Sequence, residues 1–198
     1  MRISKKIITL IMAAAVVFSS SAVVFADTTY PTDTLNTPLQ APVNFLIDKK
    51  ILTGYPDGTF KPDNSITRAE IAVAVAKMTN RTSDLEAMTK KNIFTDLSGY
   101  DWAKGYINAL NDVGILKGKT STTFAPASNI TYAELITILV RTNPGAASEI
   151  ESVGTWPDNY IQYVQMYNML GDVSITDWNA PATRGDTAKL MYRFTPKN

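Results

Sequence analysis

The chain contains no cysteine and no histidine among its 198 residues. Without cysteine there are no disulfide bonds. Without either residue type, Ser-His-Asp and Cys-His catalysis and the usual structural zinc or iron–sulfur sites are also excluded. The side chains left for chemistry are carboxylates, lysine, tyrosine, serine and threonine. We therefore expect no metal site and no cofactor.

An excess of positive charge is also missing. The chain has 19 basic and 18 acidic residues, a net charge of +1, and an isoelectric point near 7.8. Nucleic-acid-binding proteins are usually far more basic. We therefore expect no nucleic-acid partner.

A long apolar run occurs at the N-terminus. Residues 1–26 combine a basic start with apolar residues 7–18 and end in Val-Phe-Ala, which is typical of a secretory signal peptide cleaved after Ala26. Three serines interrupt the run before it reaches the roughly 20 residues that a membrane span needs. We expect a secreted chain with no membrane association after cleavage. Cleavage removes three basic residues, so any anionic ligand must be held by a local cluster of positive charge.

The remainder of the chain contains internal repeats. Residues 43–77 align without a gap on residues 107–141 at a shift of 64. A third copy follows at a further shift of 54, which pairs Trp102 with Trp156. The predicted divisions are a signal peptide at 1–26, a flexible leader at 27–40, and repeats at 41–90, 91–147 and 148–198.

Apolar spacing predicts two helices in each repeat. In the second repeat Trp102, Tyr106 and Leu110 recur at four-residue intervals, as on one face of a helix. A Pro-Asp-Gly turn at residues 56–58 separates the two helices of the first repeat. We therefore predict an all-α chain of three helix-loop-helix repeats.

Each second helix begins with a threonine followed three residues later by an acid. This spacing fits a capping box, in which the threonine side chain and the acid satisfy each other's backbone amides. The acids are therefore interpreted as structural, and the shorter aspartate is expected to make the weakest box. The pairs are Thr67 with Glu70, Thr131 with Glu134, and Thr183 with Asp186.

Arg68 and Arg184 directly follow two of these caps. A cation at the positive end of the helix dipole costs about 0.3 to 1 kcal/mol unless something compensates it. One possible compensation is a neighbouring carboxylate. The other is a ligand anion received jointly by the guanidinium and the free amides of the helix start. The sequence leaves both explanations open, and Tyr132 takes this position in the second repeat.

These repeats resemble the S-layer homology (SLH) module. The most specific string is Gly-Tyr-Pro-Asp-Gly-Thr-Phe-Lys-Pro at residues 54–62, followed by Ile-Thr-Arg-Ala-Glu at 66–70. The resemblance implies a pseudo-threefold arrangement around a central helical bundle, with grooves between neighbouring repeats. In that family the grooves bind, without covalent bonds, the secondary cell-wall polysaccharide, often through a pyruvylated N-acetylmannosamine.

Carried onto this chain, the resemblance implies that Arg68 and Arg184 contact the anionic sugar. It also implies that Gly54 and Gly118 let the backbone approach the sugar. Tryptophan rings could offer apolar faces to the sugar or could anchor the core. The full set of predicted groove residues is Arg68, Arg184, Thr67, Thr131, Thr183, Gly54, Gly118, Trp102, Trp156 and Tyr132.

The copies also depart from the family pattern. Because Tyr132 replaces arginine, we expect at most two competent anion sites, and a groove on Tyr132 should bind weakly or only support its neighbours. Pro38 stands where the other copies have tryptophan, so the first helix is expected to start after Pro42.

Together these features predict a non-enzymatic protein at the cell surface. Its expected partners are the pyruvylated secondary cell-wall polymer and other surface-layer proteins. The alternative is a degenerate triplet that mediates protein contacts or surface assembly without binding glycan. A small wall glycosidase would need two paired carboxylates. Asp57, Asp96, Asp101 and Asp158 show no spacing that pairs them.

Overall fold

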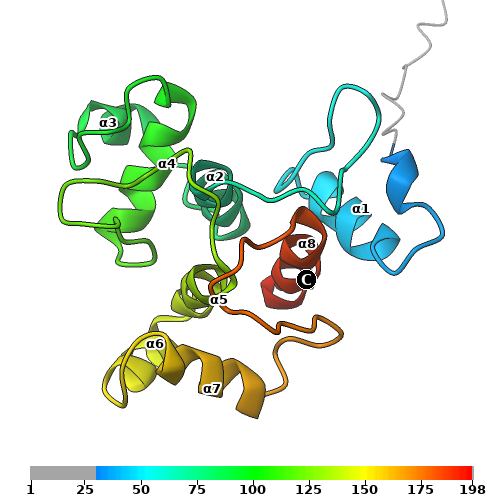
Figure 1. The fold of residues 1–198 in the computed structure, drawn as a ribbon. Helices are drawn as coiled ribbons and strands as arrows, with labels where there is room; N and C mark the ends of the chain where they lie inside the picture. The colour runs from blue at the N-terminus through cyan, green and yellow to red at the C-terminus, as the bar shows by residue number, and fades with distance from the viewer. Residues whose placement is uncertain (1–29, 198) are drawn as a thin grey trace, which may run out of the picture.

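The computed structural model describes residues 30–197, in which the regular elements are all helices, joined by long loops (Figure 1). The predicted signal peptide lies outside this range. No helix within residues 30–197 is both long and apolar enough to cross a membrane. The elements are η1 (Thr32–Thr34), α1 (Gln40–Asp48), α2 (Arg68–Met78), α3 (Leu85–Lys90), α4 (Asp101–Asp112), α5 (Tyr132–Arg141), α6 (Pro144–Glu151), α7 (Asp158–Met166) and α8 (Arg184–Phe194). The all-α prediction is confirmed.

Three central helices, α2, α5 and α8, are surrounded by three outer lobes (Figure 1). Helix α2 packs on α4, α5 packs on α7, and α8 packs on α1. The second helix of each repeat therefore packs against the first helix of the next repeat. The contact of α8 with α1 closes this arrangement into a ring, so the repeats are interlocked.

A triangle of backbone hydrogen bonds joins the three repeats just before the central helices. The Ile66 amide donates to the Ala182 carbonyl (3.3 Å), the Ala182 amide to the Ile130 carbonyl (2.8 Å), and the Ile130 amide to the Ile66 carbonyl (3.1 Å). All three residues are fully buried. Buried backbone groups must be paired, and here each repeat supplies the partner for the next.

The first helix of each repeat ends in the same way. A residue with left-handed backbone follows α1, α4 and α7, namely Lys50 (φ 56°), Gly114 (φ 73°) and Asn168 (φ 48°). In each case the next amide donates back to a carbonyl in the last turn of the helix, as in a common helix C-cap. The third copy therefore shares the backbone design of the first two.

Two predictions for the N-terminal part are wrong. Within the expected flexible leader, residues 30–40 are part of the fold: Asp33 accepts hydrogen bonds from the Phe60 and Lys61 amides (both 2.8 Å), and Thr34 is fully buried. Residues 27–29 lie outside the described range. Helix α1 also starts at Gln40 and not after Pro42, because proline is tolerated in a first helical turn, where its missing amide is not needed.

Candidate functional site

The first amides of each central helix donate to the loop of a neighbouring repeat. At α2 the Arg68 amide donates to the Ser128 carbonyl (2.9 Å) and the Ala69 amide to the Pro126 carbonyl (3.2 Å). Helices α5 and α8 begin with the same pair of bonds. The first two amides of α5 donate to the Ala180 and Trp178 carbonyls, and the first two amides of α8 donate to the Asn64 and Pro62 carbonyls. These helix starts therefore offer no pair of free amides to a ligand, so an anion held jointly by arginine and free amides, one of the two explanations left open by the sequence, does not apply.

Threonine caps satisfy the next amide at each start. Thr67 and Thr131 form complete capping boxes with Glu70 and Glu134. The Thr183 side chain accepts from the Asp186 amide, 3.1 Å away, but the aspartate makes no return bond. The prediction that this third box is the weakest is confirmed.

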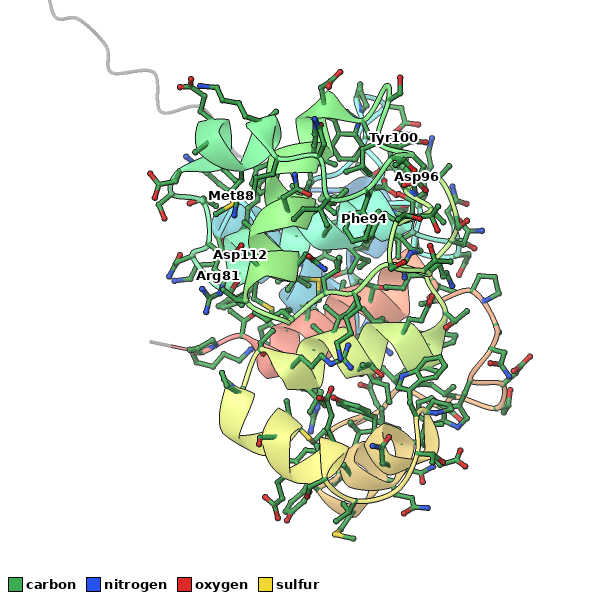
Figure 2. The ribbon with its side chains drawn as sticks, turned by 90° about the vertical axis from the view of Figure 1, so that its left-hand side faces the viewer. Arg81, Met88, Phe94, Asp96, Tyr100 and Asp112 are labelled. Atoms are coloured by element: carbon green, nitrogen blue, oxygen red, sulfur yellow. The ribbon has the colours of Figure 1, made fainter. Side chains whose placement is uncertain are left out.

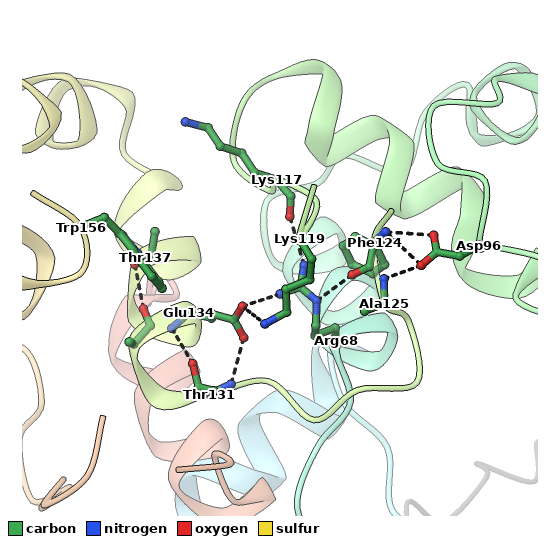
Figure 3. Close-up of polar contacts among 11 residues, drawn as sticks. Arg68, Asp96, Lys117, Lys119, Phe124, Ala125, Thr131, Glu134, Thr137 and Trp156 are labelled. Atoms are coloured by element: carbon green, nitrogen blue, oxygen red, sulfur yellow. Dashed lines mark hydrogen bonds and ion pairs between the residues drawn. The ribbon is translucent and has the colours of Figure 1, made fainter. Parts of the chain in front are cut away.

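Arg68 is buried, with 3% of its surface exposed, and its guanidinium joins two repeats (Figure 3). Nε donates to the Phe124 carbonyl (2.9 Å), Nη2 to the Lys117 carbonyl (3.1 Å), and Nη1 to Oε1 of Glu134 (3.1 Å). Burial lowers the pKa of Arg68, while the charge of Glu134 opposes this effect. Of the two explanations left open by the sequence, the neighbouring carboxylate is the one found.

Arg184 occupies the same position on α8 and is 4% exposed. Nε donates to the Phe60 carbonyl and Nη2 to the Thr53 carbonyl, both at 2.9 Å. Nη1 lies 3.8 Å from Oε1 of Glu70, which is too long for a hydrogen bond. Among the described residues, this nitrogen has no hydrogen-bond partner. Arg184 therefore keeps donor capacity that Arg68 uses for Glu134.

Tyr132 completes the ring of contacts between central helices. Its hydroxyl donates to Oδ2 of Asp186 (2.5 Å), so the first residue of each central helix contacts the acid in the first turn of the next. Burial and the bond to Asp186 raise the pKa of Tyr132. The long tyrosine reaches the short aspartate, but this contact contains no cation that could receive an anionic ligand.

Two equivalent clefts open beside the arginines. The Arg184 cleft has a volume of about 140 Å³ and includes Arg184, Thr53, Glu70, Val73, Lys77 and Trp102. The Arg68 cleft has a volume of about 430 Å³ and includes Arg68, Lys117, Glu134, Thr137, Arg141 and Trp156. Each residue of the first set corresponds by the repeat shifts to one residue of the second. The fold has therefore built the same cleft twice.

The tryptophans of these clefts are only half buried. Trp102 is 53% exposed and Trp156 is 54% exposed. The Trp156 indole donates to the Thr137 hydroxyl (2.9 Å), which fixes the ring beside α5. The interpretation of these residues as core anchors is therefore wrong, and both rings keep surface available to a ligand.

The Arg68 cleft has an excess of positive charge. Lys119 donates to the same Glu134 oxygen as Arg68 (Figure 3). Burial alone would raise the pKa of Glu134, but Lys119, Arg68 and the Thr131 amide together lower it below its ordinary value. Arg141 pairs with Glu151 at 2.6 Å. With Lys117 also present, cations outnumber carboxylates, which favours an anionic ligand.

The two glycines have a structural role. A Cβ atom on Gly118 would lie 2.5 Å from the Phe94 ring and from the Thr120 and Thr123 carbonyl oxygens. One on Gly54 would lie 2.9 Å from the Thr59 carbonyl oxygen. Both loops need glycine because the chain folds closely on itself. The close approach is made by the loop and not by a ligand.

Two of the nominated carboxylates are unsuited to acid catalysis. The pKa of Asp57 is lowered to about 2 by hydrogen bonds from Lys61 and Thr59. Asp96 accepts from the Phe124 and Ala125 amides, and although burial opposes them, these bonds lower its pKa. A glycosidase general acid needs a raised pKa. Asp96 instead holds its loop in place, as Asp33 does in the first repeat.

Sequence reasoning missed the basic residues on the cleft walls. Glu134, Thr137 and Arg141 are spaced three and four residues apart and therefore share one helix face. The shift of 64 pairs Arg141 with Lys77, so a search for charges shared by the repeats could have found both. Lys117 and Lys119 have uncharged counterparts in the first repeat, and only the folded loop shows their position.

Comparison with known proteins identifies related sequences. A family model described as the S-layer homology domain matches residues 36–72 and 93–136. The chain is 30% identical over 94% of its length to the middle cell wall protein of Brevibacillus brevis, covering 18% of that protein. It is 36% identical over 61% of its length to a cellulosome-anchoring protein of Acetivibrio thermocellus, covering 28%.

A Bacillus endoglucanase is also similar, with 38% identity over 48% of this chain and 10% of the enzyme. The chain thus spans less than a third of each of these three relatives. Both segments matched by the family model lie within the first two predicted repeats, apart from residues 36–40.

Proposed function

This chain belongs to the S-layer homology family, and from that premise we propose that it is a non-enzymatic, secreted protein that attaches to the bacterial cell wall. The ligand we propose is the secondary cell-wall polysaccharide, recognised through a pyruvylated sugar. Binding takes place in the Arg184 and Arg68 clefts. The relative named as a cellulosome-anchoring protein supports a role in attachment.

The observation that carries this proposal is the recurrence of one cleft at two equivalent places. Each cleft combines a buried arginine, a basic residue in the last turn of a central helix, and a half-exposed tryptophan. A pyruvylated sugar presents one carboxylate and one apolar ring face. Charged hydrogen bonds would hold the carboxylate, and the indole face would cover the ring.

The two clefts are proposed to differ in how they hold the carboxylate. In the Arg184 cleft, Nη1 of Arg184 and the ammonium of Lys77 receive it, because Lys77 forms no ion pair with a described residue. In the Arg68 cleft, Lys117, Lys119 and Arg141 surround the entrance. At the third equivalent place between repeats, Tyr132 replaces the arginine and Pro38 replaces the tryptophan. We assign no glycan to this place.

Co-sedimentation with purified cell-wall sacculi tests the proposal, before and after removal of the secondary polymer. The variant of choice is Trp102→Ala plus Trp156→Ala, because the arginines hold the fold together and the exposed indoles do not. Val113→Ala, which removes exposed apolar surface away from both clefts, is the matched control.

We expect wild type and the Val113→Ala control to pellet only with untreated sacculi, and the double tryptophan variant to stay in solution. Equal pelleting with stripped sacculi would contradict recognition of the polymer. Equal pelleting of the tryptophan variant would contradict the clefts as its site. Absence of pelleting for wild type would favour a triplet that contacts proteins without binding glycan.

A further inference from the structure

The outer lobes of the second and third repeats differ in how tightly their two helices pack. Short helix α3 lies directly on α4 at Gly105, where a Cβ atom would be 2.7 Å from Oγ1 of Thr89 and 2.9 Å from the Leu85 carbonyl oxygen. Figure 2 shows this lobe, with Phe94 and Asp96 at one end and Met88 and Asp112 at the other. The glycine makes this close approach possible.

The lobe of α6 and α7, drawn in yellow and orange in Figure 1, has Asn159 at the position equivalent to Gly105. The Asn159 side chain donates to the Ile150 carbonyl at the end of α6 (3.0 Å). Because this side chain stands between the helices, α6 cannot lie on α7 as α3 lies on α4. A cleft of about 430 Å³ is left between them.

This α6–α7 cleft is lined by Glu149, Val153, Asp158, Tyr163, Met166 and Tyr167. Met166 is 77% exposed, and Val153 and Tyr167 are each 61% exposed. Exposed apolar groups gathered around a cavity of this size mark a binding surface, whereas apolar residues scattered singly do not. The glycan proposal does not use this surface.

The charge around the α6–α7 cleft has one sign. Between Arg141 and Arg184 the chain has no lysine or arginine but has five acids, Glu149, Glu151, Asp158, Asp172 and Asp177. The two carboxylates that line the cleft, Glu149 and Asp158, form no ion pair within the described residues. An occupant of matching charge must therefore be basic.

We propose that the α6–α7 cleft docks a segment of a partner protein that presents apolar side chains between lysine or arginine residues. The apolar side chains enter beside Val153 and Met166. The basic side chains pair with Glu149 and Asp158. The acidic rim and the absence of cations exclude the anionic wall polymer from this cleft, so the protein has one surface for the wall and another for a protein.

Fluorescence anisotropy with three labelled nonapeptides tests this proposal. The basic-apolar probe is Gly-Lys-Lys-Leu-Phe-Leu-Lys-Lys-Gly. In the acidic probe glutamate replaces each lysine, and in the polar probe serine replaces each apolar residue. The proteins are wild type, the charge-reversed variant Glu149→Lys plus Asp158→Lys, and, as the matched control, Glu86→Lys plus Asp112→Lys, which reverses two exposed carboxylates on the lobe of α3 and α4.

We expect wild type and the Glu86→Lys plus Asp112→Lys control to bind the basic-apolar probe saturably and the other two probes weakly. Charge reversal should weaken that binding by about tenfold or more and create a preference for the acidic probe, a reversal that misfolding cannot produce. Equal binding of the basic and acidic probes, or no effect of reversal, would overturn the proposal.

Sedimentation velocity of wild type alone distinguishes a partner from a second copy. We expect a monomer at the concentrations used. A dimer that the charge-reversed variant does not form would show that a second copy occupies the cleft, and would overturn the assignment to a partner. Because sacculi binding is measured separately, failure of either proposal leaves the other standing.

Discussion

At the scale of single residues, the arginine after the first and the third threonine cap is first a structural group. Arg68 gives hydrogen bonds to Phe124, Lys117 and Glu134, and its guanidinium carbon lies 4.6 Å from the centre of the Phe124 ring. A buried cation is tolerated when such partners satisfy it. Tyr132 and Asp186 form the corresponding contact without a cation.

Arg68→Met should therefore destabilise the fold. The loss would be about 2 to 4 kcal/mol, because two buried carbonyls lose their donor and Glu134 loses one of its cations. Urea unfolding followed by circular dichroism measures it. Lys119→Met, which removes the exposed cation from the same carboxylate, should cost less than about 1 kcal/mol. A smaller loss for Arg68→Met than for the control would contradict this role.

Glu134 should make stability depend on pH. Its folded-state pKa lies below the ordinary value of 4.5, so its stabilising contribution is complete above that value and is lost as the pH falls through the lowered pKa. Chemical unfolding at a series of pH values should show Glu134→Gln with a shallower loss of stability than wild type below about pH 5. The exposed Glu86→Gln control should follow wild type, and parallel curves for all three proteins would contradict the prediction.

At the scale of elements, the contrast between Gly105 and Asn159 decides how each lobe closes. The sequence shift pairs these residues, but it does not show that α3 or α6 forms or where it packs. Both short helices lie in segments with weak apolar periodicity, so only tertiary contact fixes them. The sequence therefore predicted the longer helices and their caps and did not predict these two.

Gly105→Ala should force α3 away from α4. The added methyl would meet Thr89 and the Leu85 backbone, and we expect a loss of about 1 to 3 kcal/mol in the free energy of unfolding. Gly145→Ala on α6 is the matched control, because the atom nearest its Cβ would be 3.5 Å away. It should stabilise the protein by about 0.4 to 1 kcal/mol. Equal effects of the two changes would show that the close packing at Gly105 is unimportant.

At the scale of the whole molecule, the interlocked packing makes the three repeats one cooperative unit. The repeats were predictable because Thr67, Thr131 and Thr183 start equivalent helices. The packing of each second helix on the first helix of the next repeat was not predictable. Apolar periodicity shows which face of a helix is buried, but it does not show which other helix covers that face. The same limit applies to the clefts, because residues of all three repeats line each of them.

Unfolding should therefore be a single transition in all three repeats. Variants that keep one tryptophan, Trp102, Trp156 or Trp178, report on different parts of the ring. We expect their fluorescence midpoints in urea to coincide with one another and with circular dichroism after correction for the stability of each variant. Separated midpoints would show that the repeats unfold independently.

The measurement that tests the central claim most directly is a titration of isotope-labelled protein with a pyruvylated N-acetylmannosamine, followed by the indole NMR signals. The chain has three tryptophans. Two flank the clefts, and Trp178 packs partly buried against the core as an internal reference. We expect the Trp102 and Trp156 signals to shift saturably while Trp178 stays in place. If the cleft signals do not move, or if Trp178 alone responds, the two clefts are not the glycan sites.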